Sequence, residues 1–399
     1  MKKPNFYLTV ITCCLFSFLV FVACNKKLQT PDTAPQITSI SPTSAGVGDT
    51  LTIYGKNLAI DTSAIKVSIN NTLIGVTSLS DDSIKLVIPA SLGSGHVELS
   101  VGGKTYDGPE FDYELKAVVT TIAGTGEVGN QDGSGLQASF NCPWGITVDV
   151  DGNLFVADCY NRLIRKISAA NNNVSTTTIG SLNFYSPYNI ALDGKTGDLY
   201  VTDFNQHVMK VTPDNSVSVI YNGDMPLAGI AVGPDGNLYI GNNTTGDIIR
   251  MDVNGQNKTT FASGLTTPRN IIFDPAGIMY VAAYDPSTNS AAIDKIDASG
   301  NISFIGHDKY FQGWEIALDA SGNFYEADHF SNLIKKIDNT GKVTVIAGNG
   351  LAADVDGIGV LASFNGPQGI TIDSKGNLYV TTFNYDTNGG NKIRKISFQ

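Results

Sequence analysis

Positive charge is scarce in this sequence. The 399 residues include 26 Lys and Arg against 37 Asp and Glu, which gives a net charge of -11. Most of such a surface would repel a phosphate backbone, so a nucleic acid is excluded as the expected partner. We also find no Ser-His-Asp motif and no Gly-rich phosphate-binding motif, so two common signatures of enzyme chemistry are missing.

Cysteine is also scarce, and three of its five copies lie in the first 24 residues. Two lysines, an apolar run of 18 residues (6–23) and then Cys24 indicate an export signal. The stretch FVAC resembles a bacterial lipobox, which implies that residues 1–24 are a lipoprotein signal peptide and that Cys24 carries the lipid. A retained transmembrane helix is the alternative, because the run is just long enough to span a bilayer. Residues 25–34 would form a polar tether.

The other two cysteines, Cys142 and Cys159, flank a predicted β-hairpin. If Asp149 on the first strand of the hairpin pairs with Leu154 on the second strand, Cys142 and Cys159 lie almost opposite each other. Cross-strand cysteines can be bridged if their side chains face the same way, and export favours pairing. A disulfide and two buried thiols are both compatible with the sequence.

Glycine is abundant, with 42 residues, and this suggests a turn-rich all-β protein. Residues 35–115 alternate apolar and polar positions in short runs separated by Gly, Pro, Asn and Asp, which predicts a small antiparallel sandwich. The stretch ISPTSAGVGDTLTIYGKNL resembles the opening of an IPT/TIG immunoglobulin-like domain. In an exported protein the resemblance implies a spacer rather than a binding site.

A unit with steps of 40 to 54 residues recurs six times over residues 116–399. Each copy reads P-x-G-I-x-x-D, then G-N-L-Y-V-A-D, then strands such as LIRKI and VTTIAG. Periods of this length with four β-runs indicate propeller blades. The sixth copy has three strands, and residues 118–124 have the fourth-strand sequence, so they should close the ring. The repeat resembles the NHL family. The expected fold is all-β: a six-bladed NHL-type β-propeller preceded by an immunoglobulin-like (IPT/TIG) β-sandwich.

The residue before the Gly of P-x-G-I should stand at the mouth of the propeller channel, and both tryptophans of the protein occupy this position. Exposed Trp and Tyr side chains suit stacking against a ligand. Packing beneath the long loops that lead into blades 1 and 6 is the alternative. In blade order the six residues are Trp144, Tyr188, Ala228, Arg269, Trp314 and Gln368.

Blade 5 carries polar residues where its sibling blades are small or apolar. Glu315 replaces the Gly or Asn of P-x-G-I, Glu326 replaces a Val or Ile, and His329 follows Asp328. An unpaired buried carboxylate is costly, so Glu326 should have a partner, a raised pKa or a water-filled channel beside it. Ligand contacts, with Glu315, Glu326 and His329 as candidate catalytic groups, are one explanation. Drift with an internal Lys or Arg partner is the other.

The ends of the second strands form an acidic ring that includes Asp158, Asp203 and Asp328. Such a ring is a candidate Ca²⁺ site, because Ca²⁺ takes six to eight oxygen ligands. The same Asp belongs to the repeat consensus, however, and can accept hydrogen bonds from turn amides in its own blade. We therefore expect no cofactor and keep Ca²⁺ as the alternative.

These residues favour a binding protein over an enzyme. The expected function is capture of a glycan or another small polar ligand at the top face of the propeller. The layout resembles lipid-anchored proteins of glycan-scavenging Gram-negative bacteria, which implies attachment to the outer membrane on either of its faces. The expected stacking residues are Trp144, Tyr188 and Trp314, and the expected hydrogen-bonding residues are Arg269, Glu315 and Gln368.

An enzyme and a protein-binding scaffold are the alternatives. Lactonase-like propellers hold an axial Ca²⁺ with carboxylates and Asn, and lyase-like propellers hold zinc with histidines. The four histidines share no repeat position, so a three-histidine zinc site is not supported. A scaffold predicts a broad apolar patch on the top face. The groups that match the lactonase pattern are Glu315, Glu326, Asp328, Asn189 and Asn270.

Overall fold

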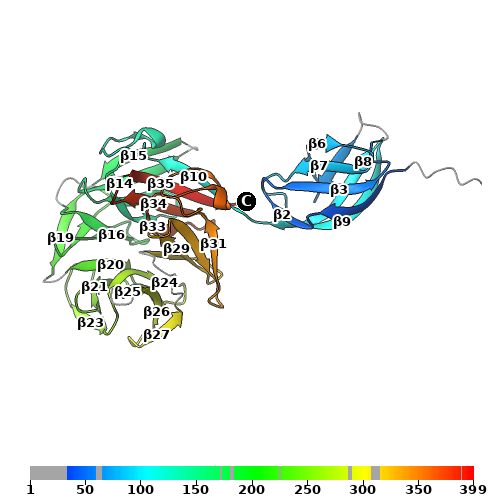
Figure 1. Cartoon of the computed structure of the whole chain (residues 1–399). Coiled ribbons are helices and arrows are strands. Elements are labelled where there is room, and N and C mark those ends of the chain that lie inside the picture. Colours follow the sequence, from blue (N-terminus) through cyan, green and yellow to red (C-terminus); the bar gives the residue numbers. More distant parts are fainter. Residues whose placement is uncertain are drawn as a thin grey trace, which may run out of the picture.

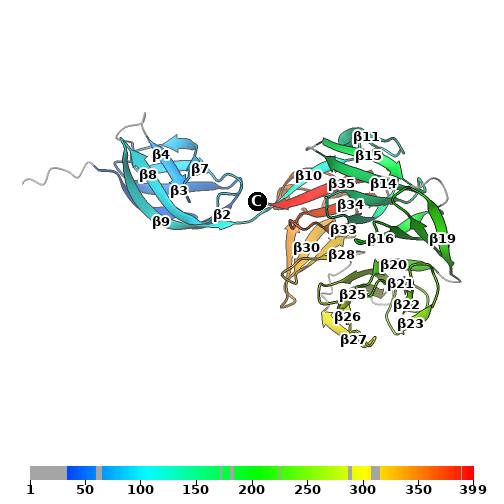
Figure 2. The ribbon, with the colours of Figure 1, turned by 180° about the vertical axis from the view of Figure 1, so that it is seen from behind.

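The computed structural model describes residues 34–59, 65–170, 173–179, 184–223, 226–285, 290–306, 315–387 and 389–399. They form an N-terminal β-sandwich and a larger ring of sheets, joined by a short segment near residue 115 (Figures 1 and 2). The predicted all-β fold is confirmed. Over these residues, no helix is long and apolar enough to cross a membrane. The expected signal peptide, Cys24 and most of the tether lie outside the described residues.

Two sheets build the sandwich around one apolar core. Period-two burial along the strands turns residues such as Leu51, Ile53 and Val97 inward. One sheet has the order β1 (Gln36–Ser41), β3 (Thr50–Lys56), β7 (Ser83–Val87) and β6 (Val76–Leu79). The other has the order β2 (Ser44–Gly46), β9 (Lys104–Glu114), β8 (Gly95–Val101), β4 (Lys66–Ile69) and β5 (Thr72–Ile74).

Six antiparallel sheets form the propeller, and each repeat copy supplies one blade. Blade 1 comprises β12 (Pro143–Val148), β13 (Leu154–Asp158), β14 (Leu163–Ala170) and β15 (Asn173–Ile179), with β11 (Gly133–Ser134) at its edge. Blade 2 comprises β16 (Pro187–Leu192), β17 (Leu199–Asp203), β18 (His207–Val211) and β19 (Val217–Asn222). Blade 3 comprises β20 (Leu227–Val232), β21 (Leu238–Asn242), β22 (Asp247–Met251) and β23 (Thr259–Ala262).

The second half of the ring repeats this plan. Blade 4 comprises β24 (Pro268–Phe273), β25 (Met279–Asp285), β26 (Ser290–Ile296) and β27 (Ile302–Gly306). Blade 5 comprises β28 (Ile316–Leu318), β29 (Phe324–Asp328), β30 (Leu333–Ile337) and β31 (Val343–Ala347). Blade 6 comprises β33 (Pro367–Ile372), β34 (Leu378–Asn384) and β35 (Gly389–Phe398), completed by β10 (Ala117–Ala123) and β32 (Gly357–Ile358).

The strand β10 closes the ring. It comes directly before blade 1 in the sequence but pairs with β35 from Ala117↔Phe398 to Ala123↔Ile393, where the sequence placed its closing strand. On its other side it pairs with the short strand β32. The backbones of Lys116 and Gln399 also exchange two hydrogen bonds, of 2.9 and 3.0 Å. The pairing joins the two ends of the propeller and covers an edge that β35 would otherwise expose.

The consensus residues have local structural roles in each blade. The Asp that ends P-x-G-I-x-x-D accepts backbone N–H bonds from the following turn, as Asp149 does from Asp151 and Asn153. Gly152 in that turn has a φ of 83°, a conformation that favours glycine. The Ile of P-x-G-I packs in apolar clusters between neighbouring blades, as Ile146 does. The turns therefore set the hairpins, and the Ile positions hold the blades together.

Candidate ligand-binding site

The six innermost strands surround the central channel of the propeller. Below its mouth lies a cavity of about 350 Å³, which these strands line in turn. A hydrogen bond across the axis closes the mouth: Asn189 Nδ2 donates to Glu315 Oε1 at 2.8 Å. Asn189 belongs to blade 2 and Glu315 to blade 5, which lie opposite each other in a ring of six. The carboxylate in P-x-G-I therefore bridges the channel instead of facing solvent.

Glycines at the equivalent position of blades 1, 3 and 6 leave room for this bridge. A Cβ at Gly145 would lie 2.8 Å from the Cα of Asn189, and one at Gly369 would lie 2.3 Å from the oxygen of Trp144 and 3.0 Å from Glu315 Oε2. A side chain at either place would displace backbone or the bridging carboxylate. The glycines at this position therefore provide the space that the side chains of Asn189 and Glu315 occupy at the channel mouth.

Burial makes Glu315 hard to ionise. Its side chain is buried, and desolvation raises its pKa to about 8. The N–H of Ile370 donates to Oε2 at 3.3 Å and partly offsets this rise. Glu315 is therefore mostly protonated at neutral pH. Both of its oxygens have partners inside the protein, so it does not serve as a surface hydrogen-bonding group for a ligand.

Glu326 lies inside blade 5, away from the channel mouth. Its Cα pairs in register with that of Lys335 on the neighbouring strand β30, and both residues are buried. Lys335 Nζ also lies 2.5 Å from Asp328 Oδ2. Of the two explanations offered by the sequence, the geometry supports the internal lysine partner. The positive charge compensates buried carboxylates that would otherwise be costly.

The expectation of an exposed stacking platform at Trp144 and Tyr188 is wrong. Their side chains are only 3% and 5% exposed, and their rings pack against each other at a centroid distance of 4.6 Å. Phe204 lies against both rings, at 6.1 Å from Trp144 and 5.0 Å from Tyr188, and Tyr385 lies 5.8 Å from Trp144. The loops between second and third strands thus cover the two rings. Trp314 lies outside the described residues.

Phe204 and Tyr385 belong to a set of four aromatic side chains that form an exposed surface above the two buried rings. Each follows the end of a second strand, and each is between 40% and 54% exposed. Edge contacts link the rings into one network: Phe383 joins Tyr160 to Tyr385, and His329 joins Tyr385 to Phe330, at centroid distances between 4.9 and 5.9 Å. We call this set the top-face aromatic surface. Its members are Tyr160, Phe204, Phe330 and Tyr385.

A usable signal for this surface was present in the sequence. The residues that follow the consensus Asp at the end of the second strand are aromatic in blades 1, 2 and 5, as in DCY, DF and DHF, and blade 6 has FNY at the same place. Blade 3 has polar residues there. The first-strand position, which carries the predicted stacking residues Trp144 and Tyr188, lies one layer below this surface. The predicted first-strand residues and the exposed rings thus lie at the same end of the propeller, one layer apart.

Polar groups lie within and beneath the aromatic network. The guanidinium of Arg269 stacks 4.0 Å from the ring centroid of Tyr284, and burial lowers its pKa. Burial also lowers the pKa of His329, which contacts the rings of Phe330 and Tyr385. Gln368 is fully buried and donates through Nε2 to the carbonyl oxygen of Phe383 at 3.1 Å. Arg269 and His329 are thus better placed than Gln368 to meet a ligand.

The acidic ring is engaged inside its own blades. The three aspartates are buried, and desolvation raises the pKa of Asp158 to about 6 although an arginine lies beside it. The partners are Arg165 for Asp158 at 2.8 Å, His207 for Asp203 at 3.0 Å and Lys335 for Asp328 at 2.5 Å. The carboxylates therefore fix the turns of the repeat, as the consensus alternative proposed.

The channel mouth does not fit an axial Ca²⁺ ion. It offers one carboxylate, and the amide oxygens of Asn189 and Asn270 already accept the N–H groups of Ile190 and Ile316. Ca²⁺ needs six to eight oxygen ligands. Within the part of the chain that the structure describes, no three or more His, Cys, Asp or Glu side chains gather in a metal-binding arrangement. The lactonase pattern is therefore only partly reproduced, and Glu326 and Asp328 lie apart from it.

Cys142 and Cys159 are buried free thiols in the structure rather than a disulfide. A register shift in the β12–β13 pair sets Pro143 opposite Asp158, and Cys159 N–H donates to the oxygen of Cys142 at 3.1 Å. Burial is the main cause of the raised pKa of Cys142. Both thiols pack beneath the aromatic network and are shielded from reagents.

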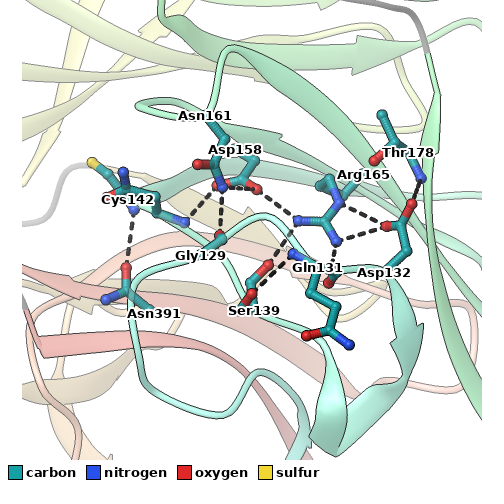
Figure 3. A network of polar contacts seen from close by, with 11 residues as sticks. Gly129, Gln131, Asp132, Ser139, Cys142, Asp158, Asn161, Arg165, Thr178 and Asn391 are labelled. Atoms are coloured by element: carbon teal, nitrogen blue, oxygen red, sulfur yellow. Dashed lines mark hydrogen bonds and ion pairs between the residues drawn. The ribbon is translucent and has the colours of Figure 1, made fainter.

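The two long loops that lead into blades 1 and 6 are fixed by buried arginines. In Figure 3, the guanidinium of Arg165 lies between the carboxylates of Asp132 in the loop and Asp158 in the blade, at 2.7 and 2.8 Å. It also donates to the carbonyl oxygens of Gln131 and Ser139. Each loop is thereby held against the third strand of its blade, close to the aromatic surface.

Blade 6 repeats this arrangement with one exchange. Arg394 binds Asp354 and Asp356 of its loop, both at 2.9 Å. Thr382 stands where blade 1 has Asp158, and its hydroxyl lies 3.2 Å from the other oxygen of Asp354. The loop therefore supplies the carboxylate that the second strand lacks.

Comparisons with known proteins agree with this architecture. A model of the IPT/TIG domain matches residues 35–113, and a model of the Teneurin NHL domain matches residues 116–312. An auxiliary nutrient binding protein from Bacteroides thetaiotaomicron is 21% identical, with a TM-score of 0.63 over 91% of this chain and 97% of that chain. One from Bacteroides ovatus is 20% identical, with a TM-score of 0.62 over 92% of this chain and 98% of that chain. At these identities the likeness establishes the fold alone.

A curated relative extends the comparison to plants. The protein SUPPRESSOR OF QUENCHING 1, chloroplastic, of Arabidopsis thaliana is 27% identical over 304 residues, which cover 67% of this chain. The chain spans only about a quarter, 26%, of the length of that relative. Together the sheets and the matches define the class: an IPT/TIG domain followed by an NHL-type six-bladed propeller.

Proposed function

We propose that this protein is an envelope binding protein that captures a glycan on its top-face aromatic surface. The observation that supports the proposal is the continuous network of rings across blades 1, 2, 5 and 6, four of which are 40% to 54% exposed. Half-exposed rings held by aromatic neighbours offer rigid apolar area with few rotamers to lose on binding. Flat rings of this kind suit the apolar faces of sugar rings.

Polar groups beside the rings supply the hydrogen bonds that a sugar requires. Arg269 and His329 are partly buried in the network, so their contacts with ligand hydroxyls would be shielded from water. The proposed binding residues are therefore Tyr160, Phe204, Phe330 and Tyr385 for stacking, with Arg269 and His329 for hydrogen bonding. Trp144 and Tyr188 support the surface from below.

The proposal includes a lipid anchor at Cys24 and a place in the envelope of a Gram-negative bacterium. The sequence FVAC after an apolar run supports the anchor. The fold shared with two Bacteroides proteins described as auxiliary nutrient binding proteins supports a role in nutrient capture. In this arrangement the sandwich is a spacer that holds the propeller away from the membrane.

A protein-binding scaffold is the second candidate, because the same exposed rings form an apolar patch. A glycan-array screen of the purified protein separates the two. We expect binding to one glycan class that is indifferent to Ca²⁺ and at least about tenfold weaker in Phe204→Ala and Tyr385→Ala, because truncating a central aromatic contact costs about 2 kcal/mol or more.

The matched control is Tyr54→Ala, which removes a similarly exposed ring from the sandwich. This variant should bind as the unaltered protein does, and all variants should keep its melting temperature within a few degrees. Binding to no glycan, or equal binding by all variants, would overturn the proposal and favour a protein partner.

A further inference from the structure

Blade 1 departs from its sibling blades at the opposite end of the propeller from the aromatic surface. Its second strand carries Phe155 where the other five blades have Tyr. In four of those blades the tyrosine hydroxyl donates to an aspartate of the first hairpin turn, at 3.0 to 3.2 Å. Phe155 has no hydroxyl, so blade 1 presents an apolar ring at this corner.

A cation lies directly beside that ring. Lys166 pairs in register with Phe155, and its Nζ lies 5.5 Å from the ring centroid. In blades 2 and 3 the equivalent cation binds a carboxylate: Lys210 binds Asp198 and Arg250 binds Asp235, both at 2.7 Å. Within the described residues Lys166 has no carboxylate partner, and it is half-buried.

A second departure lies at the rim. The first residue after the turn aspartate is Val150 in blade 1, whereas blades 2 to 6 have Gly, Pro, Pro, Ala and Ser at this place. Val150 is 89% exposed, so its apolar side chain is available to a ligand at the rim.

All three residues line one cavity between blades 1 and 2. The cavity has a volume of about 470 Å³, within the usual range for small-molecule sites of roughly 300 to 1,000 Å³. Its walls are mainly apolar, and they include Ile179, Leu192 and Val211. The two carboxylates that line it, Asp149 and Asp193, already accept turn N–H groups. Lys166 is the cationic side chain in this lining, and its ammonium has bonding capacity left for a ligand.

We propose that this cavity is a second binding site, which takes a small apolar carboxylate. The hydrocarbon part would pack against Phe155 and Val150, and the carboxylate would accept a hydrogen bond from Lys166 Nζ. Burial of apolar area supplies the affinity, and a half-buried ammonium selects an anion over a neutral molecule. The site is independent of the aromatic surface and of the glycan.

The fold contains an internal control for this proposal. A cavity of about 440 Å³ occupies the equivalent place between blades 4 and 5, and it also has a lysine, Lys295. Its floor is Tyr280, whose hydroxyl donates to Asp274 at 3.2 Å, and Pro275 stands where blade 1 has Val150. This second cavity thus has the same architecture with a more polar floor.

Titration calorimetry with decanoate, kept below its micelle concentration, tests the proposal. One site is expected. Lys166→Met should weaken decanoate binding about tenfold or more while leaving the neutral 1-decanol unchanged. Phe155→Tyr, which installs the residue of the sibling blades, should weaken both molecules. The control Lys295→Met should change neither, and glycan binding should persist in all three variants.

The absence of decanoate binding at millimolar concentration would overturn the proposal. Equal affinities in Lys166→Met and Lys295→Met would also overturn it, because binding would then not depend on this cavity. Loss of glycan binding alone would leave the cavity site standing and would count against the top-face site.

Discussion

Two buried glutamates in the same blade have different surroundings. Glu326 lies across the ladder from a lysine, so positive charge compensates its burial. Glu315 has the neutral donors Asn189 Nδ2 and Ile370 N–H as partners, so no positive charge among the described residues offsets its desolvation, which raises its pKa to about 8. A raised pKa at Glu315 is therefore a consequence of its place in the channel bridge. It is not evidence of catalysis by itself.

Glu315→Gln should flatten the pH dependence of stability. The folded protein holds this proton more tightly than the unfolded chain, whose Glu has an ordinary value of 4.5. The stability contributed by Glu315 is thus complete below about pH 4.5 and is lost as the pH rises to about 8, by up to about 1.4 kcal/mol per pH unit. Denaturant unfolding of both proteins across this range should show the variant losing less stability.

Glu127→Gln provides the control, because Glu127 is exposed in a loop. Its curve should run parallel to that of the unaltered protein. Parallel curves for Glu315→Gln as well would show that the bridge carboxyl does not titrate in this range, and the closed channel mouth would need another explanation.

At the scale of elements, the two long loops depend on single buried arginines. Arg394 bonds Asp354, Asp356 and the carbonyl oxygens of Val355 and Ser363. Arg165 makes corresponding contacts in blade 1, with loop Asp132, strand Asp158 and two loop carbonyl oxygens, as Figure 3 shows. Each arginine thus holds its loop in place with hydrogen bonds and ion pairs, in the role that apolar packing has in other loops. The loops have few apolar anchors apart from Phe140 and Phe364, over which the guanidinium groups lie.

Arg394→Met should destabilise the propeller by about 3 to 5 kcal/mol, because Asp354 would remain buried without its charged partner. Arg250→Met is the matched control. Its ion pair with Asp235 lies at the surface, so its loss should cost about 0 to 1 kcal/mol. Urea unfolding monitored by circular dichroism gives both values. Equal effects would mean that the loop is held mainly by Phe364 and not by the ion pair.

The elements were more predictable than the site. Blade number and ring closure follow from local repetition, because each copy of P-x-G-I and Y-V-A-D builds its own hairpin. The burial of Trp144 depends on Phe204 and Tyr385, which come from loops of blades 2 and 6. The bond from Asn189 to Glu315 joins residues 126 positions apart. Contacts between residues so far apart form only when the ring closes. The repeat spacing predicts the blades, but it does not predict which side chains at the channel mouth are buried and which are exposed.

At the scale of the whole molecule, the sandwich and the propeller have separate apolar cores. The sandwich core contains residues of the sandwich alone, from Ile40 to Phe111. An ion pair from Lys116 to Asp49 links the two parts. The propeller, by contrast, depends on β10, which places Ala117, Val119 and Ala123 in two of its clusters.

Two fragments should therefore behave differently. Residues 115–399 should unfold cooperatively at nearly the melting temperature of the propeller in the full chain, because none of the described sandwich residues belongs to its cores. Residues 124–399 lack β10 and should melt at a much lower temperature, since β35 loses its partner and the cluster around Val119 is opened. Differential scanning calorimetry compares them. Similar melting of both fragments would show that the seam contributes little to closure.

The position of β10 also determines how the protein responds to mechanical load. A pulling force applied to the sandwich enters the propeller at Lys116, between the last sandwich strand, β9, and β10 (Figure 1). The strand is paired along its whole length with β35, from Ala117 to Ala123. Pulling along its axis stresses these hydrogen bonds together, in shear, instead of breaking them one after another. The strand that closes the ring thus acts as a clamp against extraction.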